Sequence, residues 1–188
     1  MFTLEGKLTF INIDQSYLKK LYGVCSEVYY KPSGYENKPY IGILINKNNR
    51  KYVIPLSSAK EKHKAWKNVN KECYLIFETA KKSSMGQGDI WVQAEGEHVK
   101  HILSVLDIKK MIPIVDGVYS RVNINPEDGD TDEVKKYKHL LNKEYSFCLK
   151  IINEVIGKAN RLYDKQMKTG KAAKFCCDFK KLEDVADQ

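Results

Sequence analysis

The spacing of the hydrophobic residues changes along the chain, and this change constrains the fold more than any other sequence feature. From Leu8 to about Ile124, short runs of β-branched and aromatic residues alternate with turn-forming residues, which is typical of β-strands. After Pro126 the hydrophobic residues recur at helical spacing instead. The sequence therefore predicts an α+β domain in which C-terminal helices cover a curved sheet or a small barrel.

The expected elements follow from these runs and from the caps and breakers between them. Two neighbouring strands form a hairpin with a polar loop at 46–50, a tyrosine-rich loop covers 24–38, and Pro113 interrupts an apolar run. A long helix begins at Thr131 or Asp132 and stops at Gly170. Strands are expected at about 8–13, 40–45, 51–56, 73–77, 90–94, 102–106 and 118–124, and helices at about 17–22, 131–167 and 178–185.

Length and composition indicate one domain with a basic surface. The 188 residues, 43% of them hydrophobic, can bury a core, so residues 1–188 are expected to form a single domain. The net charge of +8 favours an anionic partner, and nucleic acid is a commoner one than a membrane. No leader-like start and no apolar run of about 20 residues is found, which predicts a cytoplasmic protein without membrane contact.

The sequence contains no motif for a metal or a cofactor. It lacks a glycine-rich phosphate loop, a dinucleotide fingerprint, a GxSxG elbow and a paired CxxC. His98 and His101 have no nearby ligand set, and the odd number of cysteines, five, favours reduced, mostly buried thiols. We therefore expect neither a metal site nor a cofactor.

A polar cluster follows the second strand of the predicted hairpin. Ser57 and Ser58 are followed by Lys60, and His63 lies three residues further on. Two interpretations fit this pattern. In the first, the serines cap a helix that runs from Lys60 to Trp66 and carries solvated lysines. In the second, the hydroxyls bind a phosphate while Lys60 supplies charge or a proton, which suffices for RNA because its 2′-hydroxyl is the nucleophile.

Several sequence blocks, in the same order along the chain, resemble the ToxN/AbiQ family, the protein toxins of type III toxin–antitoxin systems. The resemblance covers most of the chain from about residue 8, whereas residues 1–7 look like an extension and 81–98 like an insertion. The blocks are Phe10-Ile11-Asn12-Ile13 with Tyr17-Leu18, the run from Tyr35 to Ile43, the run from Lys51 to Lys60 with His63, the run from Leu106 to Ile114, and Cys177-Asp178-Phe179 with Leu182-Glu183.

The resemblance implies a compact Kid/MazF-like antiparallel β-barrel with additional helices, mainly C-terminal. It also implies metal-independent, sequence-selective cleavage of cellular or phage RNA in abortive infection, and inhibition by a repeated, folded, pseudoknotted antitoxin RNA. The best-known assembly of this family is a ring of three toxins and three RNAs. The catalytic residues implied by the matching positions are Tyr35, Lys38, Ser57, Ser58, Lys60 and His63, and among these Lys38 lies where the spacing varies between members.

For this activity we expect 2′-hydroxyl attack that leaves a 2′,3′-cyclic phosphate and a 5′-hydroxyl, with Tyr35 or His63 acting on the 2′-hydroxyl. Basic and aromatic residues outside the catalytic cluster are expected to bind RNA. Two alternatives stay open: a non-catalytic RNA-binding module, and a small-molecule enzyme with a basic surface. The expected RNA-binding residues are Lys31, Lys62, Lys64, Trp66, Lys109 and Lys110.

Overall fold

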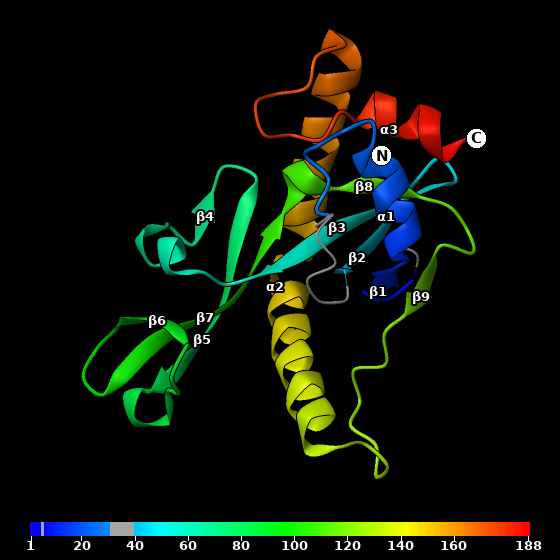
Figure 1. Ribbon diagram of the computed structural model, residues 1–188. Helices are drawn as coiled ribbons and strands as arrows, with labels where there is room; N and C mark the ends of the chain where they lie inside the picture. The colour runs from blue at the N-terminus through cyan, green and yellow to red at the C-terminus, as the bar shows by residue number, and fades with distance from the viewer. Residues whose placement is uncertain (5, 31–39) are drawn as a thin grey trace. The chain divides into compact units, whose positions relative to one another are not determined.

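The computed structural model describes residues 1–4, 6–30 and 40–188, and Figure 1 labels their helices and strands. Within these ranges, β-strands alternate with three α-helices and three short 3-10 helices. The elements are β1 (Phe10–Ile13), α1 (Gln15–Tyr22), β2 (Tyr40–Lys47), β3 (Arg50–Ser58), η1 (Glu61–Ala65), β4 (Val69–Asn70), β5 (Cys73–Lys81), η2 (Lys82–Ser84), β6 (Ile90–Gln93), β7 (His98–Asp107), η3 (Ile108–Lys110), β8 (Ile112–Ile114), β9 (Tyr119–Arg121), α2 (Asp132–Thr169) and α3 (Phe179–Ala186).

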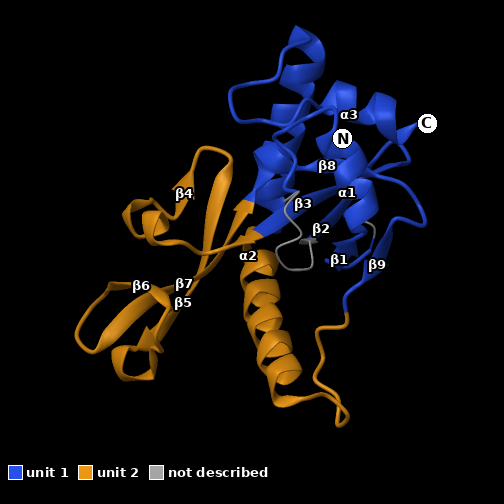
Figure 2. Ribbon diagram, viewed as in Figure 1, with its two compact units in different colours: residues 1–56, 107–122, 152–188 blue, residues 57–106, 123–151 orange. Residues whose placement is uncertain are grey.

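The chain divides into two compact units (Figure 2). Unit 1 comprises residues 1–56, 107–122 and 152–188, and unit 2 comprises residues 57–106 and 123–151. The chain passes repeatedly between them, so β3, β7 and α2 each contribute residues to both units. The expectation of a single domain over residues 1–188 stays a prediction.

Unit 1 contains an antiparallel sheet with α1, α3 and the C-terminal part of α2. The strand order is β9-β1-β2-β3, and β8 pairs with residues 51–53 of β3. The ring of Phe2 packs edge-on against Tyr52 and Tyr163, with centroid distances of 5.2 and 5.3 Å. Burial of this aromatic cluster and of the apolar faces of α1 and α3 is the main driving force for folding this unit.

The hairpin of β2 and β3 turns more tightly than the sequence suggested. The expected polar loop at 46–50 is only two residues long, because Asn46 pairs with Lys51 and Lys47 with Arg50. Asn48 and Asn49 both have positive φ, 52° and 64°, the conformation of a two-residue type I′ turn. Asparagine tolerates this conformation better than most residues, which explains why the strands extend to the turn.

Unit 2 contains a second group of strands, with β5 between β4 and β7 and with β6 on the other edge of β7. Its core includes Cys73, Leu75, Ile102 and Val105. The 81–98 stretch that looked like an insertion contains η2 and β6. β7 begins at His98, earlier than expected, because residues 99–102 pair with β6.

The helices and the cysteines agree with the sequence analysis. α2 ends at Thr169, and Gly170 follows with a φ of 66°, as the C-terminal stop signal predicted. The Asp178 carboxylate accepts a hydrogen bond of 3.2 Å from the Lys181 amide and so caps α3. All five cysteines are free and buried. The α+β class with antiparallel strands and C-terminal helices is confirmed, although the strand order of each unit is open among the described residues.

Candidate functional site

Ser57 and Ser58 are the last residues of β3, not the cap of a helix. The capping interpretation is therefore wrong, because the pairing of β3 extends the strand conformation through the serines. Upstream of the serines, Tyr52, Val53 and Ile54 are fully buried, so the end of the strand is firmly anchored. Successive side chains on a strand point to opposite faces, so the two hydroxyls diverge, and Ser58 is the more exposed of the two.

A short turn fixes the backbone of Lys60. The Lys60 amide donates to Nδ1 of His63 over 2.9 Å, and the His63 amide donates to the Lys60 carbonyl over 2.8 Å. This reciprocal pair begins the 3-10 helix η1, which replaces the longer helix of the capping interpretation. The Lys60 side chain is exposed, and among the described residues no carboxylate forms an ion pair with it. Its charge is therefore available to a phosphate.

His63 is buried, with 3% of its surface exposed, and its ring lies 4.6 Å from that of Trp66. Burial, with help from the charges of Lys62 and Lys60, holds the pKa of His63 below its usual value. The ring is therefore neutral near pH 7, and its Nδ1 lone pair is already used by the Lys60 amide. This geometry favours a positioning role for His63 over removal of a proton from substrate.

The expected RNA-binding residues near this turn differ in what they can offer. The half-buried Trp66 packs against the core of unit 2, and Lys62 Nζ lies 5.7 Å from its ring centroid. Lys64 forms an ion pair of 2.8 Å with Glu61. Lys62 and Lys60 are thus the exposed cations of the turn, whereas the charge of Lys64 is partly neutralised.

In unit 1, a second polar cluster surrounds η3. The Asp107 carboxylate accepts from the Lys109 amide over 3.0 Å and from the Tyr29 hydroxyl over 3.2 Å. Lys110 is 9% exposed and forms an ion pair with Glu27, so its expected role as an exposed RNA contact is not supported by its burial. Lys109 is half-buried. No sequence motif indicated that Tyr29 and Asp107 form a polar pair, although Asp107 lies inside one of the quoted blocks.

Three of the expected site residues, Lys31, Tyr35 and Lys38, lie outside the described residues. Of the remaining catalytic candidates, Ser57, Ser58, Lys60 and His63 follow one another within unit 2. Their arrangement supplies hydroxyl donors, a rigid turn and an ammonium group that has no ion-pair partner among the described residues, which suits the binding of a phosphodiester.

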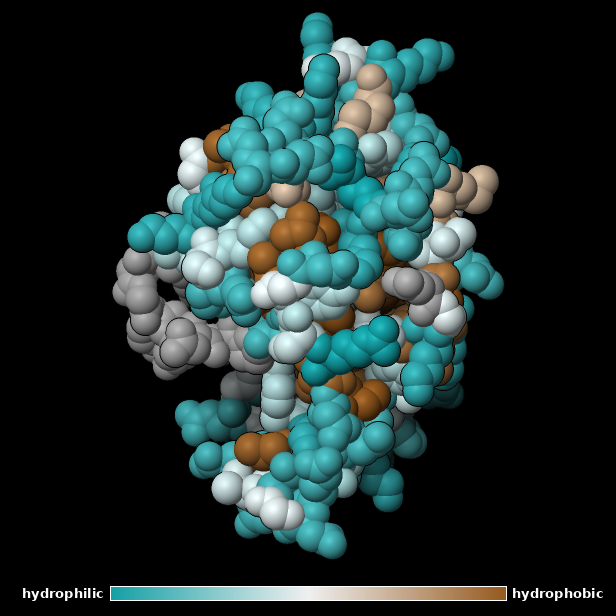
Figure 3. All heavy atoms as spheres, turned by 90° about the vertical axis from the view of Figure 1, so that its right-hand side faces the viewer, coloured by the Kyte–Doolittle hydropathy of each residue, from teal (hydrophilic) through white to brown (hydrophobic). Residues whose placement is uncertain are grey.

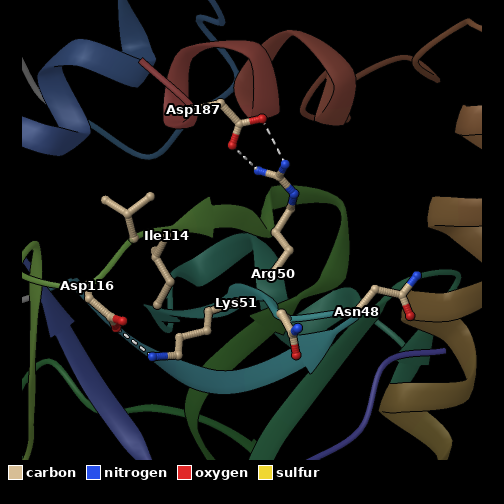
Figure 4. Close-up of a pocket in the computed structure, with 8 residues that line it drawn as sticks. Asn48, Arg50, Lys51, Ile114, Asp116 and Asp187 are labelled. Atoms are coloured by element: carbon tan, nitrogen blue, oxygen red, sulfur yellow. Dashed lines mark hydrogen bonds and ion pairs between the residues drawn. The ribbon is translucent and has the colours of Figure 1, made fainter.

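Unit 1 also has a surface pocket of about 360 Å³ beside the hairpin turn (Figure 4). Arg50 forms two hydrogen bonds of 2.8 Å with the Asp187 carboxylate, and Lys51 lies 2.5 Å from Asp116. Both cations are thus neutralised by carboxylates that would repel a phosphate. The Arg50 contact joins the hairpin to the end of α3, so a structural role is the better explanation for this pocket.

The described residues form neither a metal cluster nor a membrane-spanning helix. No group of three or more histidine, cysteine, aspartate or glutamate side chains there has the arrangement of a metal site. None of the helices in the same part of the chain is long and apolar enough to span a membrane.

Comparison with known proteins identifies related sequences along nearly the whole chain. The profile of the family described as "Toxin ToxN, type III toxin-antitoxin system" matches residues 9–187. The endoribonuclease AbiQ of Lactococcus lactis subsp. lactis is 30% identical over 189 residues, which cover 96% of this chain and 88% of AbiQ. The endoribonuclease ToxN of Bacillus thuringiensis subsp. kurstaki is 25% identical over 187 residues, covering 95% and 82% of the two chains.

Solved structures show the same fold. AbiQ, a lactococcal anti-phage endoribonuclease of a type III toxin–antitoxin system, matches with a TM-score of 0.64 and 26% identity over 97% of both chains. A structure from a type III system in which a non-coding RNA pseudoknot selectively inhibits the toxin matches with a TM-score of 0.65 and 23% identity over 96% of both chains.

Proposed function

Because the chain belongs to the ToxN family of toxins of type III toxin–antitoxin systems, we propose that it is a metal-independent endoribonuclease whose site contains Ser57, Ser58 and Lys60. The observation that carries the proposal is the end of β3. There an anchored strand presents two hydroxyls, and the next turn presents an ammonium group without a carboxylate partner among the described residues.

The reaction begins when a base removes the proton of a 2′-hydroxyl. The 2′-oxygen then forms a bond to the adjacent phosphorus, the bond from phosphorus to the 5′-oxygen breaks, and the Lys60 ammonium gives a proton to that leaving oxygen. The products are a 2′,3′-cyclic phosphate and a 5′-hydroxyl. Ser58, the more exposed hydroxyl, donates to a non-bridging oxygen as negative charge develops there.

His63 acts through Lys60 in this scheme. Its Nδ1 accepts from the Lys60 amide, so it fixes the backbone from which the Lys60 side chain extends toward the phosphate. Since Nδ1 is engaged, Tyr35 is the better of the two proposed groups for orienting or deprotonating the 2′-hydroxyl. Lys38 would add charge at the same phosphate.

The first test is the cleavage rate of purified Lys60 variants on a single-stranded RNA in the presence of EDTA. Loss of a general acid costs about 10² to 10⁴ in rate, so we expect Lys60→Ala to lose activity by that factor. Lys67→Ala is the matched control, because it removes an exposed lysine just after the same turn that has no assigned role. Near-normal cleavage by Lys60→Ala would contradict the assignment.

The same assay separates an enzyme from a non-catalytic RNA-binding module. A binding module retains RNA but produces no new ends, whatever the incubation time. We expect new ends from the wild-type protein in EDTA. Cleavage that appears only when Mg²⁺ is added would contradict the metal-independent part of the proposal.

We further propose that a repeated, pseudoknotted antitoxin RNA inhibits this toxin by occupying the same site. An RNA-inhibited toxin of the same fold supports this proposal, as does the net charge of +8. The assembly we propose is a cytoplasmic ring of three toxins and three RNAs. Light scattering on the copurified complex tests it, since any other stoichiometry contradicts the ring.

A further inference from the structure

The loop that connects α2 and α3, whose course Figure 1 shows, contains an exposed aromatic residue. Phe175 is 58% exposed, and its φ of 61° lies in the left-handed region. Large aromatic residues rarely adopt this conformation, and burial is their usual contribution to stability. Core packing therefore explains neither the exposure of the ring nor its backbone.

The backbone after Phe175 is held firmly in unit 1. The buried Gln166 donates to the Cys177 carbonyl over 3.0 Å and accepts from the Phe179 amide over 2.5 Å. The Cys177 amide donates to the Lys109 carbonyl over 2.8 Å, which ties the loop to η3. A ring presented from a fixed backbone loses little conformational freedom when a ligand stacks on it.

The segment that leads to Phe175 is strongly basic. Residues 165–174 contain four lysines and no acidic residue, and all four are exposed. In the described part of the chain, none of the ion pairs involves them. Lys165 and Lys168 follow Arg161 at helical spacing and so share a face of α2, and Lys174 Nζ lies 4.9 Å from the Phe175 ring centroid.

We propose that Phe175 and the lysines at 165, 168, 171 and 174 form a second RNA-binding surface, called here the Phe175 surface. An unpaired base stacks on the Phe175 ring, and the lysines contact the flanking phosphates. This inference rests on the proposed endoribonuclease function and extends it to residues outside the catalytic cluster. Lys109, which the sequence analysis expected to bind RNA, continues the surface because its carbonyl is bonded to the same loop.

Single-stranded RNA fits this surface better than a duplex or a membrane. A duplex exposes phosphates but no unstacked base for the ring. An anionic membrane would be favoured by several exposed apolar residues together, but Phe175 is the only large apolar side chain exposed between residues 150 and 188. Figure 3 shows the side of the molecule that lies to the right in Figure 1, where hydrophilic side chains surround several hydrophobic areas near the middle.

The test is fluorescence anisotropy with a labelled, mixed-sequence 2′-O-methyl RNA, which cannot be cut by 2′-hydroxyl attack. We expect Phe175→Ala to weaken binding of the single strand about fivefold or more and to leave binding of the matching duplex unchanged. Replacing Lys171 and Lys174 by serine is expected to weaken binding of both the single strand and the duplex. For the single strand, the slope of log Kd against log salt concentration falls by about 0.7 for each phosphate that the variant no longer neutralises. Leu149 is an apolar residue that is 49% exposed, so Leu149→Ala is the control for the loss of an exposed apolar side chain.

A second variant separates RNA binding from stability. Glycine tolerates the left-handed backbone, so Phe175→Gly is expected to raise the melting temperature while it weakens binding of the single strand. If both Phe175 variants bind the single strand with wild-type affinity, the proposed Phe175 surface is refuted. It is also refuted if the variants bind phosphatidylserine vesicles more weakly than the wild-type protein while their RNA binding is unchanged.

The two proposals fail in distinguishable ways. If the wild-type protein cleaves RNA but both Phe175 variants bind the single strand normally, only the Phe175 surface is refuted. If the wild-type protein neither binds nor cleaves single-stranded RNA, the endoribonuclease function is refuted, and the Phe175 surface with it.

Discussion

Replacing Glu144 by glutamine is expected to stabilise the protein above pH 7. Glu144 lies on α2 in unit 2 and is 5% exposed. Burial raises the pKa of its carboxyl from 4.5 to about 7, although the neighbouring Ser104 hydroxyl favours the charged form. The carboxylate also contributes to raising the pKa of Cys148, which is fully buried nearby.

The magnitude follows from linkage. An acid whose pKa is raised on folding contributes no cost at low pH, where it is protonated in both states. Stability then falls as the pH rises from 4.5 to about 7 and is constant above that range, because the unfolded chain ionises first. The full difference corresponds to about 3 kcal/mol at 1.36 kcal/mol per pKa unit. Glutamine stays neutral, so the variant lacks this loss.

Urea unfolding at pH 5 and pH 8 measures the effect. We expect the wild-type protein to lose about 2.5 kcal/mol between the two pH values relative to Glu144→Gln, less than the full difference because the unfolded carboxyl is already partly ionised at pH 5. The hydrogen-bond cost of the buried amide is the same at both pH values and cancels in this comparison. The exposed Glu95→Gln is the control. A parallel pH dependence of stability in wild-type protein and Glu144→Gln would refute the reasoning.

Two further predictions concern the hairpin and the Lys60 turn. A Cβ at Gly42 would lie 2.5 Å from both the Ile54 carbonyl oxygen and a Val53 methyl, so Gly42→Ala is expected to lower the free energy of unfolding by roughly 1–3 kcal/mol or more, whereas Gly129→Ala, in open space, is not. The pKa of His63 is lower in the folded protein than its ordinary value of 6.5. The contribution of His63 to the free energy of unfolding is therefore complete above pH 6.5 and is lost as the pH falls below that value. Protonation of His63 also removes the acceptor of the Lys60 amide, so the cleavage rate is expected to decline in acid. The side-chain oxygen of the His63→Asn variant can accept the same hydrogen bond at any pH, so the variant is expected to show a smaller decline. An equally steep decline in the variant would contradict the positioning role.

Most of the elements could be predicted because their signals are local. Each of these signals depends on residues that are close in sequence. The structure confirms the helical spacing of α2, its end before Gly170 and the cap at Asp178. The turn at Asn48 and Asn49 was assigned too long, since pairing with the partner strand decides where a hairpin ends. The serines were ambiguous for the same reason: the same residues that cap helices also end strands.

The candidate site was only partly predictable. Ser57, Ser58, Lys60 and His63 are close in sequence, so one motif was enough to group them. The pairing of Lys110 with Glu27 joins residues 83 positions apart, and the bond from Tyr29 to Asp107 joins residues 78 apart. Such pairings depend on tertiary packing, which no local pattern records. The positive φ of Phe175 could not be predicted either, because the sequence alone does not specify the backbone conformation of this loop.

The most direct test of the central claim is mass spectrometry of the ends of a defined RNA after incubation with the purified protein in EDTA. The proposed mechanism predicts a 2′,3′-cyclic phosphate and a 5′-hydroxyl at each cut from the wild-type protein, and no cuts above background from Lys60→Ala. Products that carry a 5′-phosphate, or equal cleavage by wild-type protein and Lys60→Ala, would contradict it.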